Sequence, residues 1–197
     1  MLHGTTIDIE GYEYRADILA HIREMIDAMI SKHNKVFVVR LDVRFPSIYE
    51  IPLDKNPITE FYRRLMVFYK YHKIDAIYFS AREQNASHHP HYHCFILLDG
   101  NKVENGWGVQ QKAAEIWQAL VGEGNASCVH LCETFEGRSG IMLRRPAQQY
   151  ASDPLSEQSI QFDATKQVIL NWLAYLAKTY TKGNSPPNAK EFHGSRL

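Results

Sequence analysis

This 197-residue sequence has no net charge and few cysteines. Lysine and arginine together number 22, as do aspartate and glutamate, so the formal charge is zero. A protein that coats nucleic acid without discrimination needs a large basic excess, and this composition disfavours that class. The 3 cysteines, Cys94, Cys128 and Cys132, lack the spacing of a disulfide framework, which favours a reducing cytoplasm.

The sequence also lacks an apolar run of membrane-spanning length, and its start, MLHGTTIDIEGYEYR, lacks the basic and then apolar pattern of a signal peptide. We therefore expect no membrane partner. Hydrophobic residues make up 45% and charged residues 22%, which is ordinary for a globular domain. With no repeat or linker visible, we expect a single domain over residues 1–182, a motif-bearing core over 35–182 and a mobile C-terminal tail over 183–197.

Hydrophobic periodicity predicts a chain of alternating helices and strands. The expected helices cover residues 18–30, 59–71, 109–121 and 165–182, and the expected strands cover residues 35–43, 74–83, 91–98 and 127–132. Residues 133–162 show weak periodicity, so we expect a long irregular excursion there. This order predicts an α+β fold in which a single mostly antiparallel sheet is flanked by helices.

Two histidines, His91 and His93, stand two residues apart in the expected strand HYHCFILL. Such side chains project from the same face of a strand, so both imidazoles can reach one cation. Glu83 ends the preceding strand, and an antiparallel hairpin brings its carboxylate to that face. Two imidazoles and one carboxylate can hold a divalent ion and leave positions for water and phosphate oxygens. The histidine pair alone is a weak signal, because the chain has 10 histidines and partly buried structural histidines are common.

The expected last helix carries Tyr175 away from the centre of its apolar stripe. At about 100° per residue, this tyrosine falls on the side of Asn171, Lys178 and Lys182. A phenol with a pKa of about 10 is a poor nucleophile at neutral pH unless a cation favours its phenolate, and Lys178 can supply that charge. Tyr180 is the competing tyrosine, but it points toward the apolar stripe. The alternative is an ordinary amphipathic helix with a surface tyrosine.

Taken together, the HYH motif, the glutamate before it and the YLAK segment resemble the HUH endonucleases. The segments AREQN, HYHCFILLDG and NWLAYLAKTYTK look most similar to segments in replication initiation proteins of filamentous phages (inoviruses) and related prophage or satellite elements. Histidines that precede the tyrosine are similar to the order in replication initiators and single-tyrosine transposases. The resemblance covers about residues 35–182.

This resemblance implies an RRM-like sheet, Mg²⁺ or Mn²⁺ as cofactor, and nicking of single-stranded or hairpin origin DNA through a 5′-phosphotyrosine intermediate. It makes His91, His93 and Glu83 the metal ligands, Tyr175 the nucleophile and Lys178 its assistant. Such an enzyme would initiate rolling-circle-type replication of a phage or mobile element. No helicase region is visible in the sequence, so unwinding would need a separate helicase.

Basic residues outnumber acidic ones over residues 59–82 and again over residues 166–196. Such local surpluses suit contact with a few phosphates, although a basic helix face is more often only solvated. The candidates for DNA contact are Arg63, Arg64, Arg82, Asn171 and Lys182.

Other functions stay open. A catalytically silent protein with the same fold could recognise an origin or hairpin without metal and without a covalent adduct. A hydrolytic metalloenzyme on small substrates would need a general base beside the histidines, where the sequence offers only Glu83. Within the nicking class, a single-tyrosine transposase is an alternative to a replication initiator.

Overall fold

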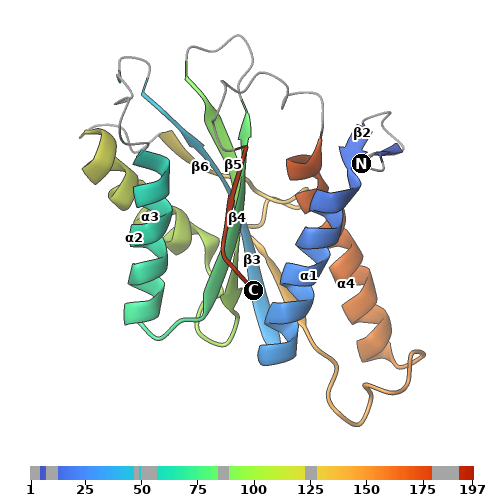
Figure 1. Ribbon diagram of the computed structural model, residues 1–197. Coiled ribbons are helices and arrows are strands. Elements are labelled where there is room, and N and C mark those ends of the chain that lie inside the picture. The colour runs from blue at the N-terminus through green and yellow to red at the C-terminus, as the bar shows by residue number, and fades with distance from the viewer. Residues whose placement is uncertain are drawn as a thin grey trace.

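The computed structural model describes residues 5–7, 13–46, 49, 57–83, 89–122, 128–178 and 191–197. These residues form a mostly antiparallel sheet of 6 strands with helices on both faces, so the expected α+β class is confirmed (Figure 1). The helices are α1 (Ala16–Lys32), α2 (Pro57–Tyr71), α3 (Gly106–Val121) and α4 (Glu157–Leu173), and α4 runs into a 3₁₀ turn, η2 (Ala174–Ala177). None of the described helices has both the length and the apolarity to cross a bilayer.

Five strands of the sheet follow one another in the order β6-β3-β5-β4-β8, and β7 also pairs with β3. They are β3 (Lys35–Arg44), β4 (Ala76–Glu83), β5 (His91–Asp99), β6 (Val129–Leu131), β7 (Ile141–Arg144) and β8 (Phe192–Gly194). The two short strands β6 and β7 pair with different stretches of β3. A separate two-stranded sheet contains β1 (Thr5–Ile7) and β2 (Glu13–Arg15).

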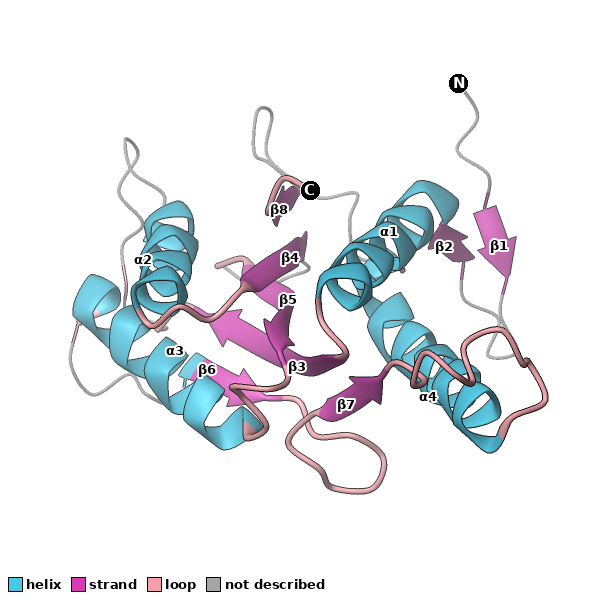
Figure 2. Cartoon of the chain, turned by 90° about the horizontal axis from the view of Figure 1, so that it is seen from below, coloured by secondary structure: helices cyan, strands magenta, loops and turns pink. Residues whose placement is uncertain are grey.

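Strand alternation divides the core into two layers, one on each face of the sheet. On β5, Phe95 and Leu97 face α1 and α4, whereas Tyr92 and Ile96 face α2 and α3. Both layers consist mainly of buried apolar side chains, and in the second the indole of Trp117 is fully buried. Figure 2, which views the molecule from below, shows these helix pairs on opposite sides of the strands. The sheet therefore has two buried faces, and polar side chains on it must be held by other protein groups.

The helix expected over residues 165–182 is misplaced at both ends. It begins at Glu157, because the Ser156 side chain caps it by accepting a hydrogen bond from the Ser159 backbone N–H. It ends at Leu173, where the chain tightens into η2 without a glycine or proline to signal the change.

Two further segments lie at the edges of the sheet. The region 133–162 is not one irregular excursion, since it contains β7 and the first turns of α4. Within the expected mobile tail over 183–197, residues 183–190 lie outside the described residues, and the described part contains β8, which pairs antiparallel with β4. Both strands were missed because they are only 4 and 3 residues long and depend on distant partners.

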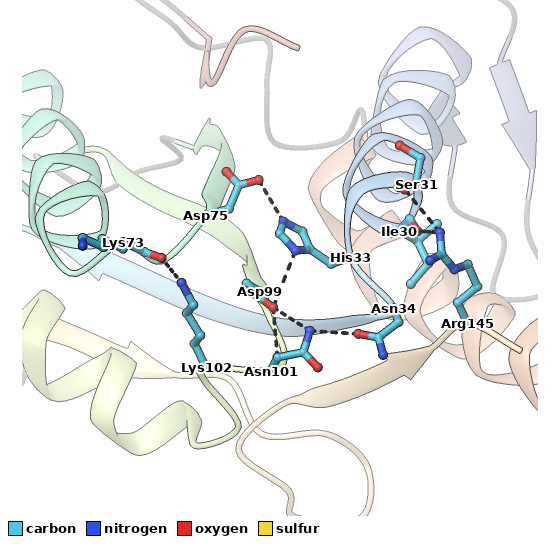
Figure 3. A network of polar contacts seen from close by, with 10 residues as sticks. All are labelled: Ile30, Ser31, His33, Asn34, Lys73, Asp75, Asp99, Asn101, Lys102 and Arg145. Carbon is cyan, nitrogen blue, oxygen red and sulfur yellow. Dashed lines mark hydrogen bonds and ion pairs between the residues drawn. The ribbon is translucent and has the colours of Figure 1, made fainter. Parts of the chain in front are cut away.

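A polar network joins the helix, strand and turn ends at one end of the sheet (Figure 3). His33, just after α1, lies 2.9 Å from the Asp75 carboxylate and 3.6 Å from that of Asp99. Asp99 also accepts hydrogen bonds from the backbone and side-chain nitrogens of Asn101. Burial raises the pKa of Asp99, but the Asn101 hydrogen bonds and the positive charges of His33 and Lys102 outweigh it, so the pKa lies below its ordinary value.

We expect Asp99→Ala to lower the free energy of unfolding at pH 7 by about 1–3 kcal/mol, because it leaves polar partners unsatisfied. Since the carboxylate has a lower pKa in the folded chain, it stabilises the fold above the ordinary pKa of about 4. That contribution is lost as the pH falls further, so wild type and variant should converge in acid. Urea unfolding across the pH range measures this gap. Glu115→Ala is the control, because Glu115 is 67% exposed and should change stability by less than about 0.5 kcal/mol.

Candidate functional site

The Glu83, His91 and His93 side chains meet at the end of the sheet opposite the polar network. Glu83 ends β4 and pairs directly with His91 at the start of β5. His91 Nε2 lies 2.8 Å from Glu83 Oε2, and His93 Nε2 contacts the same oxygen. One ligand atom from each of the three residues lies within 4.8 Å of the others. The convergence expected from the hairpin is confirmed, and this Glu-His-His cluster could bind a divalent metal.

The chemistry of the donor set fits such an ion. Both imidazoles turn Nε2 toward one carboxylate, so lone pairs are gathered at a single point. His93 and Glu83 are buried, whereas the His91 side chain is 24% exposed, which leaves one side of the cluster open to water or substrate. A set of two nitrogens and one carboxylate that is open on one side suits a divalent ion that must also bind substrate.

Asp42 on β3 supports His93 from behind. It pairs with His93 across the sheet, and its Oδ1 lies 2.6 Å from His93 Nδ1. Burial alone would lower the pKa of His93, but hydrogen bonds to Asp42 and Glu83 raise it overall. Burial raises the pKa of Asp42, and the His93 hydrogen bond and the charge of Arg40 reverse this and lower it. A carboxylate on Nδ1 leaves Nε2 for a metal, which is the usual outer partner of a ligating histidine.

Tyr175 lies against this cluster. Its ring centroid is 4.8 Å from that of His93, with the two planes 82° apart. Lys178 Nζ lies 4.9 Å from the centroid of the tyrosine ring, and the guanidinium carbon of Arg40 lies 4.3 Å from it. The tyrosine singled out from the sequence therefore shares a site with the cluster, although its role as a nucleophile stays a prediction.

The local setting of Tyr175 differs from the expected polar face of a continuous helix. It lies in η2, where about three residues make a turn, so Lys178 comes back over it. Leu176 and Ala177 are buried, and Lys178 forms a β-bridge with Tyr14 of β2. These contacts fix the turn, and they leave the tyrosine half-buried rather than on a solvated surface.

Burial raises the pKa of Tyr175 above its ordinary value. The negative charges of Glu83 and Asp42 add to this effect, and the guanidinium of Arg40 opposes it. Two carboxylates beside the phenol thus disfavour its ionisation. A cation held at Glu83 would offset the larger of these two repulsions, so the tyrosine's surroundings also fit a metal at the cluster.

Sequence reasoning missed Arg40 and Asp42. Both interrupt the apolar strand KVFVVRLDV two residues apart, so they share a face with each other and with the cluster. Arg40 also donates from Nη1 to the Trp172 carbonyl at 3.3 Å. The detectable signal was a pair of charges at alternate positions in a stretch, residues 36–43, that is otherwise apolar.

The remaining candidates for DNA contact do not gather at the site. Arg82 pairs with Tyr92, on the face covered by α2 and α3, and is only 6% exposed. Arg63 and Arg64 lie on α2 beyond that face, and both hydrogen-bond to Glu60. Their contact with DNA stays a prediction, and this placement does not favour it.

The last two candidates for DNA contact, Asn171 and Lys182, come later in the sequence than the Glu-His-His cluster. Asn171 is exposed on α4, where it accepts a hydrogen bond from Gln167. Lys182 lies outside the described residues, as does the competing tyrosine Tyr180. DNA contact by Asn171 or Lys182 therefore stays a prediction.

Comparison with known proteins gives a family and a distant structural likeness. No curated protein matches the chain. Among solved structures, the catalytic domain of the adeno-associated virus type 5 Rep protein matches with a TM-score of 0.32 and 14% identity, over 71% of this chain and 98% of that chain. A likeness at this score carries no argument about activity. The model of the family described as the YagK/YfjJ C-terminal domain matches residues 2–193, and the chain therefore belongs to that family.

Proposed function

We propose that this protein is a metal-dependent nicking enzyme that cuts and rejoins single-stranded DNA with a tyrosine nucleophile. The observation that carries the proposal is the meeting of Tyr175 and His93, whose ring centroids are 4.8 Å apart, at the Glu-His-His cluster. The two halves come from segments about 80 residues apart, yet they form one site that contains a nucleophile, cations and metal ligands.

In the reaction, the Tyr175 hydroxyl oxygen attacks a backbone phosphorus and loses its proton to solvent. A bond from the tyrosine to phosphorus forms as the bond from phosphorus to the 3′-oxygen breaks. The departing oxygen takes a proton and becomes a free 3′-hydroxyl, while the 5′ side stays linked as a phosphotyrosine. The reverse reaction, with a 3′-hydroxyl as the attacking group, rejoins a strand. No net bond energy is lost, so the link is stored for joining.

The chain's own residues prepare this step. Arg40 and Lys178 place positive charge over the Tyr175 ring, where they oppose the repulsion from the nearby carboxylates. Asp42 fixes the orientation of His93. Glu83, His91 and His93 would hold Mg²⁺ or Mn²⁺, and such an ion, when bound, would supply the positive charge that polarises the scissile phosphate.

A role in initiating rolling-circle-type replication of a phage or mobile element follows from the resemblance to HUH replication initiators. In that role the substrate is origin DNA, single-stranded or in a hairpin, and a separate helicase unwinds it. A single-tyrosine transposase would use the same chemistry on the ends of an element. A binding protein that lacks activity would use the same fold without forming any covalent link.

The first test concerns the nucleophile. We expect Tyr175→Phe to abolish the denaturation-resistant protein–DNA adduct that wild type forms with single-stranded DNA and Mn²⁺, because only the attacking hydroxyl is lost. Lys178→Ala should slow adduct formation roughly 10- to 100-fold, because a neighbouring charge assists an oxyanion without replacing it. Denaturing gel electrophoresis with labelled DNA measures both rates.

Tyr180→Phe is the matched comparison and should keep most of the activity. An adduct that survives Tyr175→Phe and disappears with Tyr180→Phe would show that Tyr180, and not Tyr175, is the attacking residue. If wild type forms no adduct with origin-type DNA under any metal condition, the nicking proposal is wrong, and the alternative of a protein that binds DNA without cutting it takes its place.

The second test concerns the metal cluster. We expect wild type to bind Mn²⁺ in a single class of site, and His93→Gln or Glu83→Gln to weaken that binding at least about 100-fold. Asp42→Asn should weaken it by about 10- to 100-fold, because it disturbs the orientation of a ligand rather than removing one. Calorimetric titration and Mn²⁺ electron paramagnetic resonance measure the affinity.

His72→Gln is the control, because His72 is exposed just after α2, on the other side of the sheet. It should bind Mn²⁺ as wild type does. Thermal melting identifies any variant that has lost its fold. A folded Glu83→Gln variant with unchanged Mn²⁺ affinity would refute the assignment of the cluster.

A further inference from the structure

A hollow lies along α4, away from the Glu-His-His cluster. It has a volume of about 1520 Å³ and lies between α4, β7 and the loop over residues 132–140. Figure 2 shows β7 beside α4 at one edge of the sheet, with that loop projecting from the same edge. We call it the α4 groove and define it by Phe135, Arg138, Arg144, Gln161, Phe162 and Trp172. The lined face of α4, from Gln158 to Trp172, is about 20 Å long at about 1.5 Å per residue.

Positive charge dominates this groove, although the chain as a whole is neutral. Lys35, Arg138, Arg144 and Arg145 line it, against Glu136 as the one acidic side chain in the lining. Arg145 is already engaged, since its Nη1 donates to the carbonyls of Ile30 and Ser31 at the end of α1.

Two arginines of the groove remain available to a ligand. Arg144 pairs with Lys35 through the β3–β7 ladder, but its side chain is exposed and makes no hydrogen bond or ion pair with the described residues. Arg138 pairs only with Glu136 within the described chain, and both of these side chains are about 70% exposed, so a phosphate can compete for the guanidinium. Together they offer two guanidinium groups to an anionic chain.

Aromatic side chains stand among these charges. Phe135 is 99% exposed, which is unusual for so large an apolar side chain. The turn that presents it is ordered, since the Thr134 hydroxyl accepts hydrogen bonds from the backbone of Glu136 and Arg138, and Gly137 takes a left-handed φ of 69°. Phe162 and Trp172 line the same groove. Trp172 is only 7% exposed, so Phe135 is the aromatic side chain that the groove offers to a ligand. Cations beside an exposed aromatic face suit single-stranded nucleic acid, in which phosphates and unpaired bases are both accessible.

The groove leads to the tyrosine through Arg40. The Arg40 carbonyl accepts a hydrogen bond from the Cys132 N–H, where the loop over residues 132–140 begins. Its guanidinium donates to the Trp172 carbonyl, at the end of α4, and lies over the ring of Tyr175. Both walls of the groove therefore start at the residue that covers the proposed nucleophile.

We propose that the α4 groove binds the single-stranded DNA next to the phosphate that Tyr175 attacks. This inference rests on the proposed function, and it moves DNA contact from Arg63, Arg64 and Arg82 to the opposite face of the sheet. Arg138 and Arg144 bind backbone phosphates, and Phe135 stacks on a base. Because these contacts read no base edges, the groove positions the strand and leaves sequence choice to other residues.

The test measures binding of a fluorescent oligo(dT) of about 20 nucleotides by anisotropy, in EDTA, so that neither metal nor cleavage contributes. We expect the double variant Arg138→Gln with Arg144→Gln to bind about tenfold more weakly. It should also lower the salt dependence of log affinity by about 1.4, at about 0.7 per phosphate contact on a single strand. Phe135→Ala should weaken binding about fivefold or more, and Phe135→Trp should restore it.

The matched control removes two other exposed arginines, with Arg23→Gln on α1 and Arg196→Gln beyond β8, and should bind as wild type does. Wild-type affinity and salt slope in both the groove double variant and Phe135→Ala would overturn the proposal. So would a lower slope caused by Arg63→Gln with Arg64→Gln instead, or a failure of wild type to bind oligo(dT) at low salt. Equal competition by duplex DNA would overturn the single-strand assignment, as would groove variants that change only self-association of the protein.

Adduct formation separates this proposal from the one on which it rests. If Tyr175-dependent adducts form equally well in wild type and in the groove variants, the nicking function stands and the groove is not its DNA site. If no adduct forms but oligo(dT) binding depends on Arg138, Arg144 and Phe135, the groove binds DNA in a protein that does not cut it.

Discussion

The register between β4 and β5 sets the geometry of the Glu-His-His cluster. Glu83 stands opposite His91, and alternation places His93 on the same face two residues later. A slip of one residue would turn Glu83 to the face that Arg82 now occupies, and the three ligands would separate. The opposite face prevents such a slip. There Tyr92 and Cys94 are fully buried, and the Tyr62 hydroxyl donates to that of Ser80 at 2.7 Å inside the apolar layer. Apolar packing on one face of the sheet therefore fixes the positions of Glu83, His91 and His93 on the other face.

Several charged groups lie close together at the site. Glu83 and Asp42 bring two carboxylates to His93, and the guanidinium of Arg40 lies over the Tyr175 ring. Ionised carboxylates that leave water need paired charges or hydrogen bonds to offset the cost of desolvation. A divalent ion held at the Glu-His-His cluster would supply such compensation and would also oppose the repulsion that raises the pKa of Tyr175. The two carboxylates therefore attract a cation and also disfavour ionisation of Tyr175.

Local patterns predicted the half of the site that lies in the hairpin. The spacing of His91 and His93 and the position of Glu83 follow from strand alternation, which tertiary packing did not change. The other half depends on non-local contacts. No sequence signal ends α4 at Leu173, and η2 exists because Leu176 enters the core and Lys178 bridges to Tyr14. Likewise β7 and β8 are short strands that form only beside β3 and β4. Arg40 and Asp42 were visible as charges in an apolar strand, but their partners are 132 and 51 residues away.

These distant contacts fix the position of the Tyr175 side chain. Its turn is fixed by the core on one side and by β2 on the other, and its ring lies between His93 and Arg40. A side chain held in this way loses little conformational entropy when it contacts a bound ligand, because its position is already fixed. The cluster, in contrast, is built within the β4–β5 hairpin and needs little from α1 or α4. The geometry of the Glu-His-His cluster and the position of Tyr175 therefore depend on different parts of the fold, which the core between α1, α4 and the sheet connects.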